Sequence, residues 1–259
     1  MPDVNNFVVI ESIYGRFVVN RRDKFQAEAL IRTGRPHIQA ELEVLLAIAG
    51  ALPNGAFAVD AGANVGLVSI PLAQALKPRG GTVLAFEVQR MIYYALCAGA
   101  VLNDLDNLFA FHQGLGAKAR VEPMAAPDYG APQDFGMYSL LNQPAQRNEA
   151  VQIATLDELG LPRLDFLKID VEGMEMEVLA GGRNMIARHR PWCWVEYWMV
   201  GAETIAGAFA GQGYECCKRH CDPCILDYWY EAMDRWRERI RAKGLDPDEV
   251  LAAFEKPRS

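Results

Sequence analysis

The sequence has few of the features that mark secreted, membrane-spanning or nucleic-acid-binding proteins. Among its 259 residues are only six cysteines and four histidines, and 33 acidic residues against 26 basic ones give a formal net charge of −7. A negative net charge argues against nucleic acid as the main partner, because binding to phosphate groups needs a basic surface. No apolar stretch reaches membrane-spanning length, and the N-terminus lacks the basic-then-apolar order of a signal peptide. We therefore expect a cytoplasmic protein with reduced thiols and no membrane partner.

The main glycine loop also lacks the G-x-G-x-x-G spacing of dinucleotide-binding folds, but a related pattern is present. The apolar run Ala56–Val59 ends at Asp60, and the small residues 61–66 (AGANVG) lead into a helical apolar pattern. Glycine lets the backbone approach a ligand closely, and the free N–H groups at the start of a helix bind the negatively charged part of that ligand. We interpret this stretch as the cradle of a nucleotide-type cofactor. The residues assigned to the cradle are Gly62, Ala63, Asn64 and Gly66.

Strands and helices alternate along most of the chain. Further strands are predicted at Thr82–Phe86, Leu108–His112, Leu164–Ile169 and Trp192–Val195. Such alternation predicts an α/β fold with a doubly wound, Rossmann-like parallel sheet. Ligands bind these sheets beyond the carboxyl ends of the strands. Polar residues stand at those ends, and we expect them to meet in one site: Asp60, Glu87, His112, Asp170 and Glu196.

The chain divides into three predicted parts. These are an N-terminal hairpin and helix over residues 1–55, a cofactor-binding domain over 56–215, and a cysteine-containing segment with a helical tail over 216–259. The hairpin is placed at Phe7–Val19 and the helix at Ile38–Leu52. Aromatic residues at helical spacing in the tail indicate either packing on the domain or a lid or homodimer face.

Two segments have no clear pattern. Residues 117–150 lack periodic apolar positions, so we expect a long irregular loop, and loops of this length are usually functional or mobile. Cysteines gather with His220 within nine residues, at positions 216, 217, 221 and 224. A zinc site usually takes two separated ligand pairs, so reduced thiols are favoured there over zinc.

Glu87, after the second strand, fits two cofactor classes. In nicotinamide dinucleotides and in S-adenosylmethionine (AdoMet), an acid at this place accepts hydrogen bonds from ribose hydroxyls. Asp60 separates the two classes, because a carboxylate is repelled by a pyrophosphate and attracted by the ammonium of a methionine moiety. The sequence therefore favours AdoMet, with His112 and Gln113 at the edge of its adenine.

Six segments carry a more specific pattern: VDAGANVG (59–66), AFE (85–87), LNDLDN (102–107), TLDELG (155–160), FLKIDVEGMEMEVLAGG (166–182) and VEY (195–197). Together they resemble the FkbM-type methyltransferases, most specifically in LKIDVEG. The resemblance implies AdoMet-dependent methyl transfer on a Rossmann-type fold, most often to oxygen in sugar or natural-product hydroxyls. Val88 stands where the family usually has proline, and the tail after about Gly211 matches nothing in the family.

Asp170, Glu172 and Glu196 are the candidate catalytic residues. An aliphatic hydroxyl is too weak an acid to ionise alone near neutral pH, so it needs a carboxylate base or a divalent metal. Asp170 ends a buried strand and is expected to contact the acceptor or the AdoMet amine, whereas Glu172 alternatively caps the following helix. The three carboxylates would suit Mg²⁺ or Ca²⁺, but we assign no metal. Lys168 is expected to pair with a nearby acid.

Four functions stay open at this point. The first is O-methyl transfer to a small hydroxylated or glycosidic molecule, and the second is N-methyl transfer on the same scaffold. The third is a nicotinamide-dependent oxidoreductase, which Asp60 and the loop spacing disfavour. The fourth is a non-catalytic AdoMet-binding or assembly protein.

Overall fold

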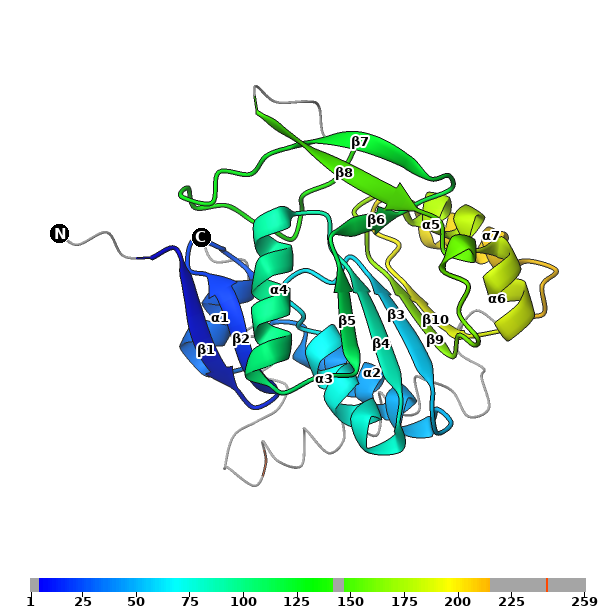
Figure 1. Cartoon of the computed structure of the whole chain (residues 1–259), viewed down its shortest axis with the longest axis horizontal. Helices are drawn as coiled ribbons and strands as arrows, with labels where there is room; N and C mark the ends of the chain where they lie inside the picture. The colour runs from blue at the N-terminus through cyan, green and yellow to red at the C-terminus, as the bar shows by residue number, and fades with distance from the viewer. Residues whose placement is uncertain (1–4, 142–146, 215–240, 242–259) are drawn as a thin grey trace.

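Five parallel strands form the centre of the computed structural model, which describes residues 5–141, 147–214 and 241 (Figure 1). The strands are β3 (Phe57–Ala61), β4 (Thr82–Phe86), β5 (Leu108–Phe111), β9 (Phe166–Ile169) and β10 (Trp192–Val195). Their order is β10-β9-β3-β4-β5, and each neighbouring pair is parallel. The predicted α/β sheet is confirmed, and its strand order reverses between β3 and β9.

Successive residues along these strands pack on opposite faces of the sheet. Ala58 and Ala85 lie in one buried cluster, and their neighbours Val59 and Phe86 lie in the other. Because side chains alternate along a strand, apolar strands of this kind need a helical layer on each side. The first layer contains α1 (Gln26–Thr33), α2 (Gln39–Ala51), α3 (Ser69–Leu76) and α4 (Arg90–Leu102). The second contains α5 (Glu175–Gly181), α6 (Arg183–His189) and α7 (Ala202–Phe209).

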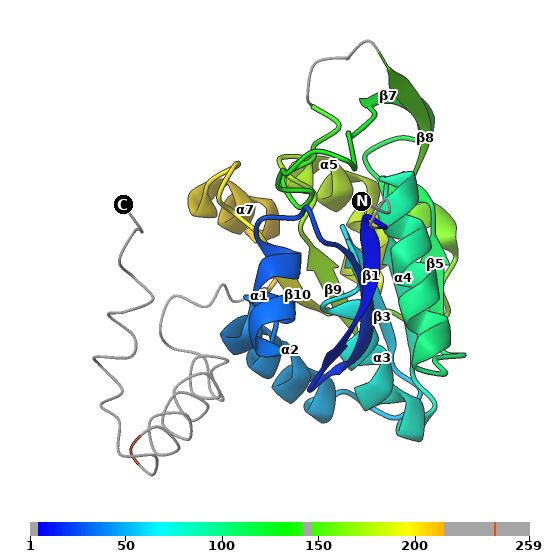
Figure 2. The same ribbon diagram turned by 90° about the vertical axis from the view of Figure 1, so that its left-hand side faces the viewer.

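The N-terminal hairpin is present, and it packs on the first layer together with one helix that the sequence pattern did not predict. β1 (Phe7–Ser12) pairs antiparallel with β2 (Gly15–Asn20), and α1 lies beside them (Figure 2). Asp23 determines where α1 begins. Its carboxylate accepts hydrogen bonds from the backbone N–H groups of Phe25 at 2.9 Å and Gln26 at 2.7 Å. Such a side-chain acceptor satisfies N–H groups that have no partner within the helix.

The prediction of an irregular loop over residues 117–150 is wrong near both ends of this range, where strands of a second sheet lie. β7 (Arg120–Ala125) pairs antiparallel with β8 (Asn148–Ala154), and β8 pairs parallel with β6 (Gln113–Leu115). The sequence does not predict β7, because its apolar residues do not alternate between buried and exposed positions in the usual way. Val121 is 65% exposed, whereas the charged Glu122 is half-buried. Pro123 is accommodated because β7 is an edge strand. Residues 126–141, which follow β7 and which we call the strap, have no regular structure over most of their length.

The tail lies outside the described residues, apart from Arg241. The predicted tail helix, its dimer face and the cysteine cluster at 216–224 therefore stay predictions, as does the three-part division of the chain. Cys97 and Cys193 are free and half-buried. Over residues 5–141 and 147–214, no helix is both long enough and apolar enough to cross a bilayer.

Gly62 brings the loop after β3 against the loop after β9. Its φ is 81°, and a Cβ at this position would lie 1.7 Å from the carbonyl oxygen of Asp170. The N–H groups of Gly62 and Ala63 donate to the carbonyl of Phe86 at 3.0 and 2.9 Å, which ties the same loop to β4. Glycine is required here both by the left-handed backbone and by the close approach. The three strand ends therefore meet at the point where the strand order reverses.

Replacing Gly62 by alanine should destabilise the protein more than the same change at Gly55. Gly55 also has a positive φ, 68°, but no atom lies within 4 Å of the place that a Cβ would occupy there. Gly55→Ala should lower the free energy of unfolding by about 1–2 kcal/mol through backbone strain alone. Gly62→Ala should lower it by about 1–3 kcal/mol more, because the added methyl forces two loops apart. Urea unfolding of the two variants measures this difference, and equal losses would contradict the close packing at Gly62.

Candidate active site

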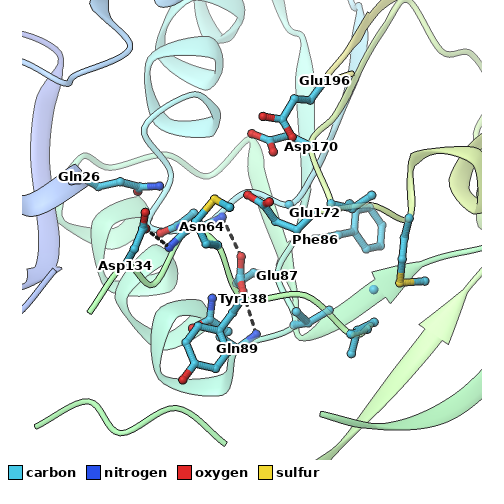
Figure 3. Close-up of a pocket in the computed structure, with 18 of the residues that line it drawn as sticks. Gln26, Asn64, Phe86, Glu87, Gln89, Asp134, Tyr138, Asp170, Glu172 and Glu196 are labelled. Atoms are coloured by element: carbon cyan, nitrogen blue, oxygen red, sulfur yellow. Dashed lines mark hydrogen bonds between the residues drawn. The ribbon is translucent and has the colours of Figure 1, made fainter. Parts of the chain in front are cut away.

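A cavity of about 430 Å³ lies beyond the carboxyl ends of the central strands (Figure 3). Polar residues or glycines that follow β3, β4, β9 and β10 line it: Gly62, Asn64, Glu87, Asp170, Glu172 and Glu196. The carboxyl ends of parallel strands meet at one edge of the sheet, so residues far apart in sequence gather there. The volume lies within the range of small-molecule binding sites.

Seven of the predicted site residues line this cavity, because Gln113 joins the six just named. The other four do not line it: Asp60, Ala63, Gly66 and His112. Ala63 and Gly66 shape the turn instead, since the N–H of Gly66 donates to the carbonyl of Ala63 at 2.9 Å. The expectation of one shared crevice therefore holds for most of the predicted residues, and Asp60 and His112 require correction.

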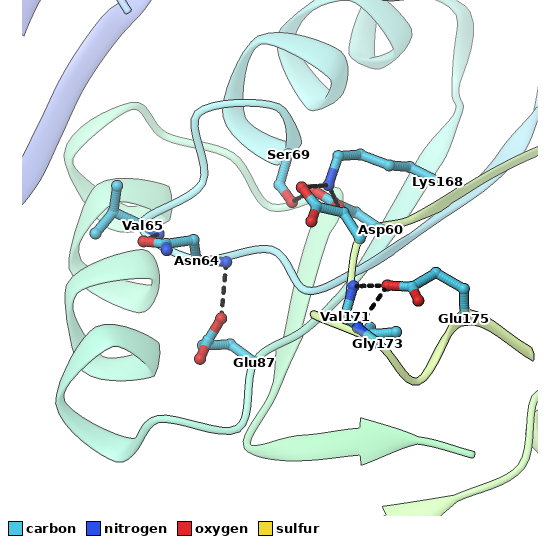
Figure 4. Close-up of polar contacts among 10 residues, drawn as sticks. Asp60, Asn64, Val65, Ser69, Glu87, Lys168, Val171, Gly173 and Glu175 are labelled. Atoms are coloured by element: carbon cyan, nitrogen blue, oxygen red, sulfur yellow. Dashed lines mark hydrogen bonds and ion pairs between the residues drawn. The ribbon is translucent and has the colours of Figure 1, made fainter. Parts of the chain in front are cut away.

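Asp60 is fully buried, which corrects the expectation that it faces a ligand ammonium. The hydroxyl of Ser69 donates to its carboxylate at 2.5 Å, and Nζ of Lys168 lies 3.4 Å from its other oxygen (Figure 4). Lys168 also donates to the carboxylate of Asp170 at 3.1 Å, so its expected pairing with an acid is confirmed. Burial alone would lower the pKa of Lys168, but the charges of Asp170 and Asp60 outweigh burial and raise it. Lys168 thus connects a buried acid to one on the cavity wall.

His112 contacts its own fold rather than the cavity. Its Nε2 lies 3.0 Å from the carbonyl oxygen of Val88, and its ring stacks on Tyr93 with centroids 5.3 Å apart. Of the two residues expected at the adenine edge, Gln113 lines the cavity and His112 does not.

Glu87 is fixed by the backbone of two loops. The N–H of Asn64 donates to its Oε2 at 2.8 Å, and the N–H of Gln89 donates to its Oε1 at 2.7 Å. Burial raises the pKa of Glu87 to about 7, although these hydrogen bonds act in the opposite direction. Each carboxylate oxygen has a second lone pair, so Glu87 has acceptor capacity left for hydroxyl groups of a ligand.

Asp170, Glu172 and Glu196 form an acidic cluster at the cavity wall. One carboxylate oxygen from each lies within 4.8 Å of the others. Burial, followed by the charges of Asp170 and Glu175, raises the pKa of Glu172 to about 7. Burial, followed by Asp170 and Glu172, raises the pKa of Glu196 to about 8. Carboxylates with pKa values near neutrality are suited to accept a proton from a bound group.

The backbone of the acidic turn is held from two sides. Glu172 has a φ of 53°, and the hydroxyl of Ser139 in the strap donates to its carbonyl at 2.6 Å. The N–H groups of Val171 and Gly173 both donate to Oε1 of Glu175, at 3.2 and 3.1 Å (Figure 4). The capping role considered for Glu172 is not observed, because α5 begins at Glu175 without a side-chain cap hydrogen bond, and the side chain of Glu172 lines the cavity instead.

Part of the cavity wall comes from segments that the sequence pattern did not assign to the site. From the N-terminal part these are Phe25, Gln26, His37, Ile38 and Glu41, and from the strap Asp134, Gly136, Met137, Tyr138 and Leu140. The two segments are joined by backbone hydrogen bonds, because Gln133 accepts one from Lys24 at 3.1 Å and donates one to Arg22 at 3.2 Å. His37 lies just before α2 and Glu41 lies in its first turn, and nothing in the sequence around them indicates a pocket.

Several known proteins are similar to this chain. A sequence profile described as the methyltransferase FkbM domain matches residues 60–244. A methyltransferase of Sordaria araneosa, sdnD, is 31% identical over 167 residues, which cover 50% of this chain and 61% of the relative.

Two solved structures are similar at low identity. The FkbM methyltransferase of Methylobacillus flagellatus is 16% identical with a TM-score of 0.42, over 68% of this chain and 45% of that one. A tRNA (uracil-54, C5)-methyltransferase of Pyrococcus abyssi is 14% identical with a TM-score of 0.39, over 72% and 33%. The chain thus covers less than two thirds of each of these proteins.

Replacing Lys168 by methionine should destabilise the protein strongly, because it leaves the carboxylate of Asp60 buried without its counter-charge. Breaking a buried ion pair in this way costs about 3–5 kcal/mol of unfolding free energy. Lys77→Met is the matched control, since Lys77 pairs with Asp106, whose side chain is 85% exposed. That change should cost no more than about 1 kcal/mol.

Urea unfolding at neutral pH measures both changes. If Lys168→Met does not fold, Asp60→Asn combined with Lys168→Met should recover a folded protein, because the buried charge is then gone. A Lys168→Met variant as stable as Lys77→Met, or a double variant no more stable than Lys168→Met alone, would contradict the assigned role.

Proposed function

The chain belongs to the FkbM family of methyltransferases, and from that premise we propose that it transfers a methyl group from AdoMet to a hydroxyl of a sugar or natural-product-like small molecule. The observation that carries the proposal is the convergence of Glu87, the Gly62–Asn64 loop and Asp170 on one cavity at the strand-order reversal. Ligands bind doubly wound sheets at this place.

The residues present fit AdoMet. Glu87 has free lone pairs for ribose hydroxyls, and Gln113 with Gly114 lines the part of the cavity assigned to adenine. Gly62 and Asn64 line the part assigned to the methionine moiety, with Asp170, in place of Asp60, as the acid for its ammonium. When bound, AdoMet would supply a methyl group attached to a positively charged sulfur.

Glu196 and Glu172 are the proposed proton acceptors. Either carboxylate would take the hydroxyl proton of the acceptor while the acceptor oxygen bonds to the methyl carbon and the carbon–sulfur bond breaks, leaving its electron pair on sulfur. The pKa of about 8 for Glu196 and about 7 for Glu172 place both groups close to the pH at which a general base is most effective. Asp170 contributes negative charge beside both and is held by Lys168.

Binding of S-adenosylhomocysteine (AdoHcy), measured by calorimetry, tests the assignment of the nucleotide site. Glu87→Gln should weaken it about ten-fold or more, because a hydrogen bond to a charged group contributes about 1.5–3 kcal/mol. Glu203→Gln, on the exposed start of α7, should leave the affinity unchanged. NAD should not bind. Tight NAD binding, or an affinity for AdoHcy that is indifferent to Glu87→Gln, would contradict the proposal.

Turnover tests the proposed base. AdoHcy formation from AdoMet, assayed against a panel of sugars and polyhydroxylated small molecules, should increase with pH through about 7–8, because Glu196 and Glu172 must lose their protons to act. Glu196→Gln should lower the rate by about 10²–10⁴-fold and remove the higher-pH part of the increase, if the proton passes to Glu196.

The same assay separates the alternatives. A neutral amine needs less help from a base, so N-methyl transfer to amine acceptors would survive Asp170→Asn and Glu196→Gln with little change. A protein that binds AdoHcy and turns over no acceptor, including those of a cell extract, would instead be a non-catalytic binder. Glu203→Gln is again the control for general effects of a lost surface charge.

A further inference from the structure

The charge of the cavity wall has a consequence for the acceptor. Resting on the proposed function, we propose that the methyl acceptor carries a cationic group, such as a substituted ammonium, near the hydroxyl that is methylated. Acceptors that carry phosphate or carboxylate groups at that place would be excluded.

Negative charge surrounds the cavity. Among the described residues that line it there are six carboxylates and no lysine or arginine. The six are Glu41, Glu87, Asp134, Asp170, Glu172 and Glu196. Glu41 comes from α2, Asp134 from the strap and the rest from the strand ends, so the charge is not confined to one turn of the chain. Lys168 does not line the cavity and is occupied by Asp60 and Asp170.

AdoMet by itself does not balance this charge. Its sulfonium and ammonium are offset in part by its own carboxylate, so it carries one net positive charge. Glu87 would be engaged by the ribose and Asp170 by the ammonium of AdoMet, which leaves Glu41, Asp134, Glu172 and Glu196 for the acceptor. A cationic acceptor gains attraction from each of these acids that is ionised, and its charge favours the ionised forms of Glu172 and Glu196, whose pKa values are raised. An anionic acceptor meets repulsion from the ionised acids, which the low dielectric of a partly enclosed cavity strengthens.

The indole of Trp198 provides an independent indication of an organic cation. Trp198 lines the cavity two residues beyond Glu196, is 80% exposed, and stacks on Tyr197 with ring centroids 5.6 Å apart. A large apolar ring left open to solvent at the edge of an acidic cavity matches the way proteins bind substituted ammonium groups, which pack on aromatic faces.

A bound metal ion would account for fewer of the acidic residues that line the cavity than an organic cation does. The oxygens that lie within 4.8 Å of one another belong only to Asp170, Glu172 and Glu196 among the described residues. Glu41 and Asp134 fall outside this group, and Trp198 offers no ligand atom. Charge distributed around a cavity and completed by an indole fits a ligand of molecular size better than a single ion.

Two alcohols of the same shape test the proposal: choline, which carries a quaternary ammonium, and 3,3-dimethylbutan-1-ol, its uncharged isostere. A third probe, 3-hydroxypropane-1-sulfonate, carries the opposite charge. Their dissociation constants are measured by ligand-observed NMR on the full chain saturated with AdoHcy, at about pH 9, above the pKa values of Glu172 and Glu196. Choline should bind at least ten-fold more tightly than its isostere, and the sulfonate should bind most weakly.

Substitutions in the cavity wall should change the ratio of the dissociation constants of choline and 3,3-dimethylbutan-1-ol. Glu196→Gln and Trp198→Ala should each reduce the preference for choline several-fold, and Glu203→Gln should preserve it. Equal binding of choline and its isostere, including the absence of detectable binding by both, would overturn the proposal, as would preferred binding of the sulfonate. Displacement of choline by millimolar Mg²⁺ would also overturn it and assign the acids to a metal. Failure of AdoHcy to bind, measured first on the same protein, would count against the proposed function instead.

Discussion

The ion pair between Lys168 and Asp60 is the constraint on which the centre of this structure depends. The two residues are partners in the register of β3 and β9, the strands between which the strand order reverses. A carboxylate that is 0% exposed needs a partner there, because an unpaired charge inside a sheet is not tolerated. The hydroxyl of Ser69 donates to the other carboxylate oxygen of Asp60 and attaches the start of α3 to the same point. One buried charge therefore fixes two strands and a helix relative to each other.

The same lysine controls the chemistry at the cavity wall because it contacts Asp170 as well. Asp170 is the member of the acidic cluster that has a cation beside it, and its own charge is a cause of the raised pKa of Glu172 and of Glu196. A buried network that holds the sheet together thus also contributes, after burial, to the raised pKa values of Glu172 and Glu196. Stability and the proposed acid–base function are consequently coupled through the position of Lys168.

The sequence allowed the sheet and the strand ends to be predicted, because both depend on local patterns. Short apolar runs closed by Asp60, Glu87, Asp170 and Glu196 identified four strand ends correctly, and parallel topology then required their convergence. The direction of a side chain at such an end was not predictable. Asp60 is the last-but-one residue of β3 and points into the protein, whereas Asp170 follows β9 and reaches the cavity. In the register of the two strands Asp60 is level with Lys168, two residues before Asp170, so Asp60 lies within the sheet and Asp170 lies beyond its edge.

The acceptor side of the cavity escaped prediction for a different physical reason. It is built by tertiary contacts between α1, the start of α2 and the strap, which carry no periodic pattern that refers to the site. The family profile begins at residue 60, yet Phe25, His37 and Glu41 line the cavity. The strand ends that we assign to AdoMet thus lie inside the matched region, and this N-terminal wall lies outside it. Under the proposed function, the charge and shape of this N-terminal wall would be the physical basis on which acceptors are distinguished.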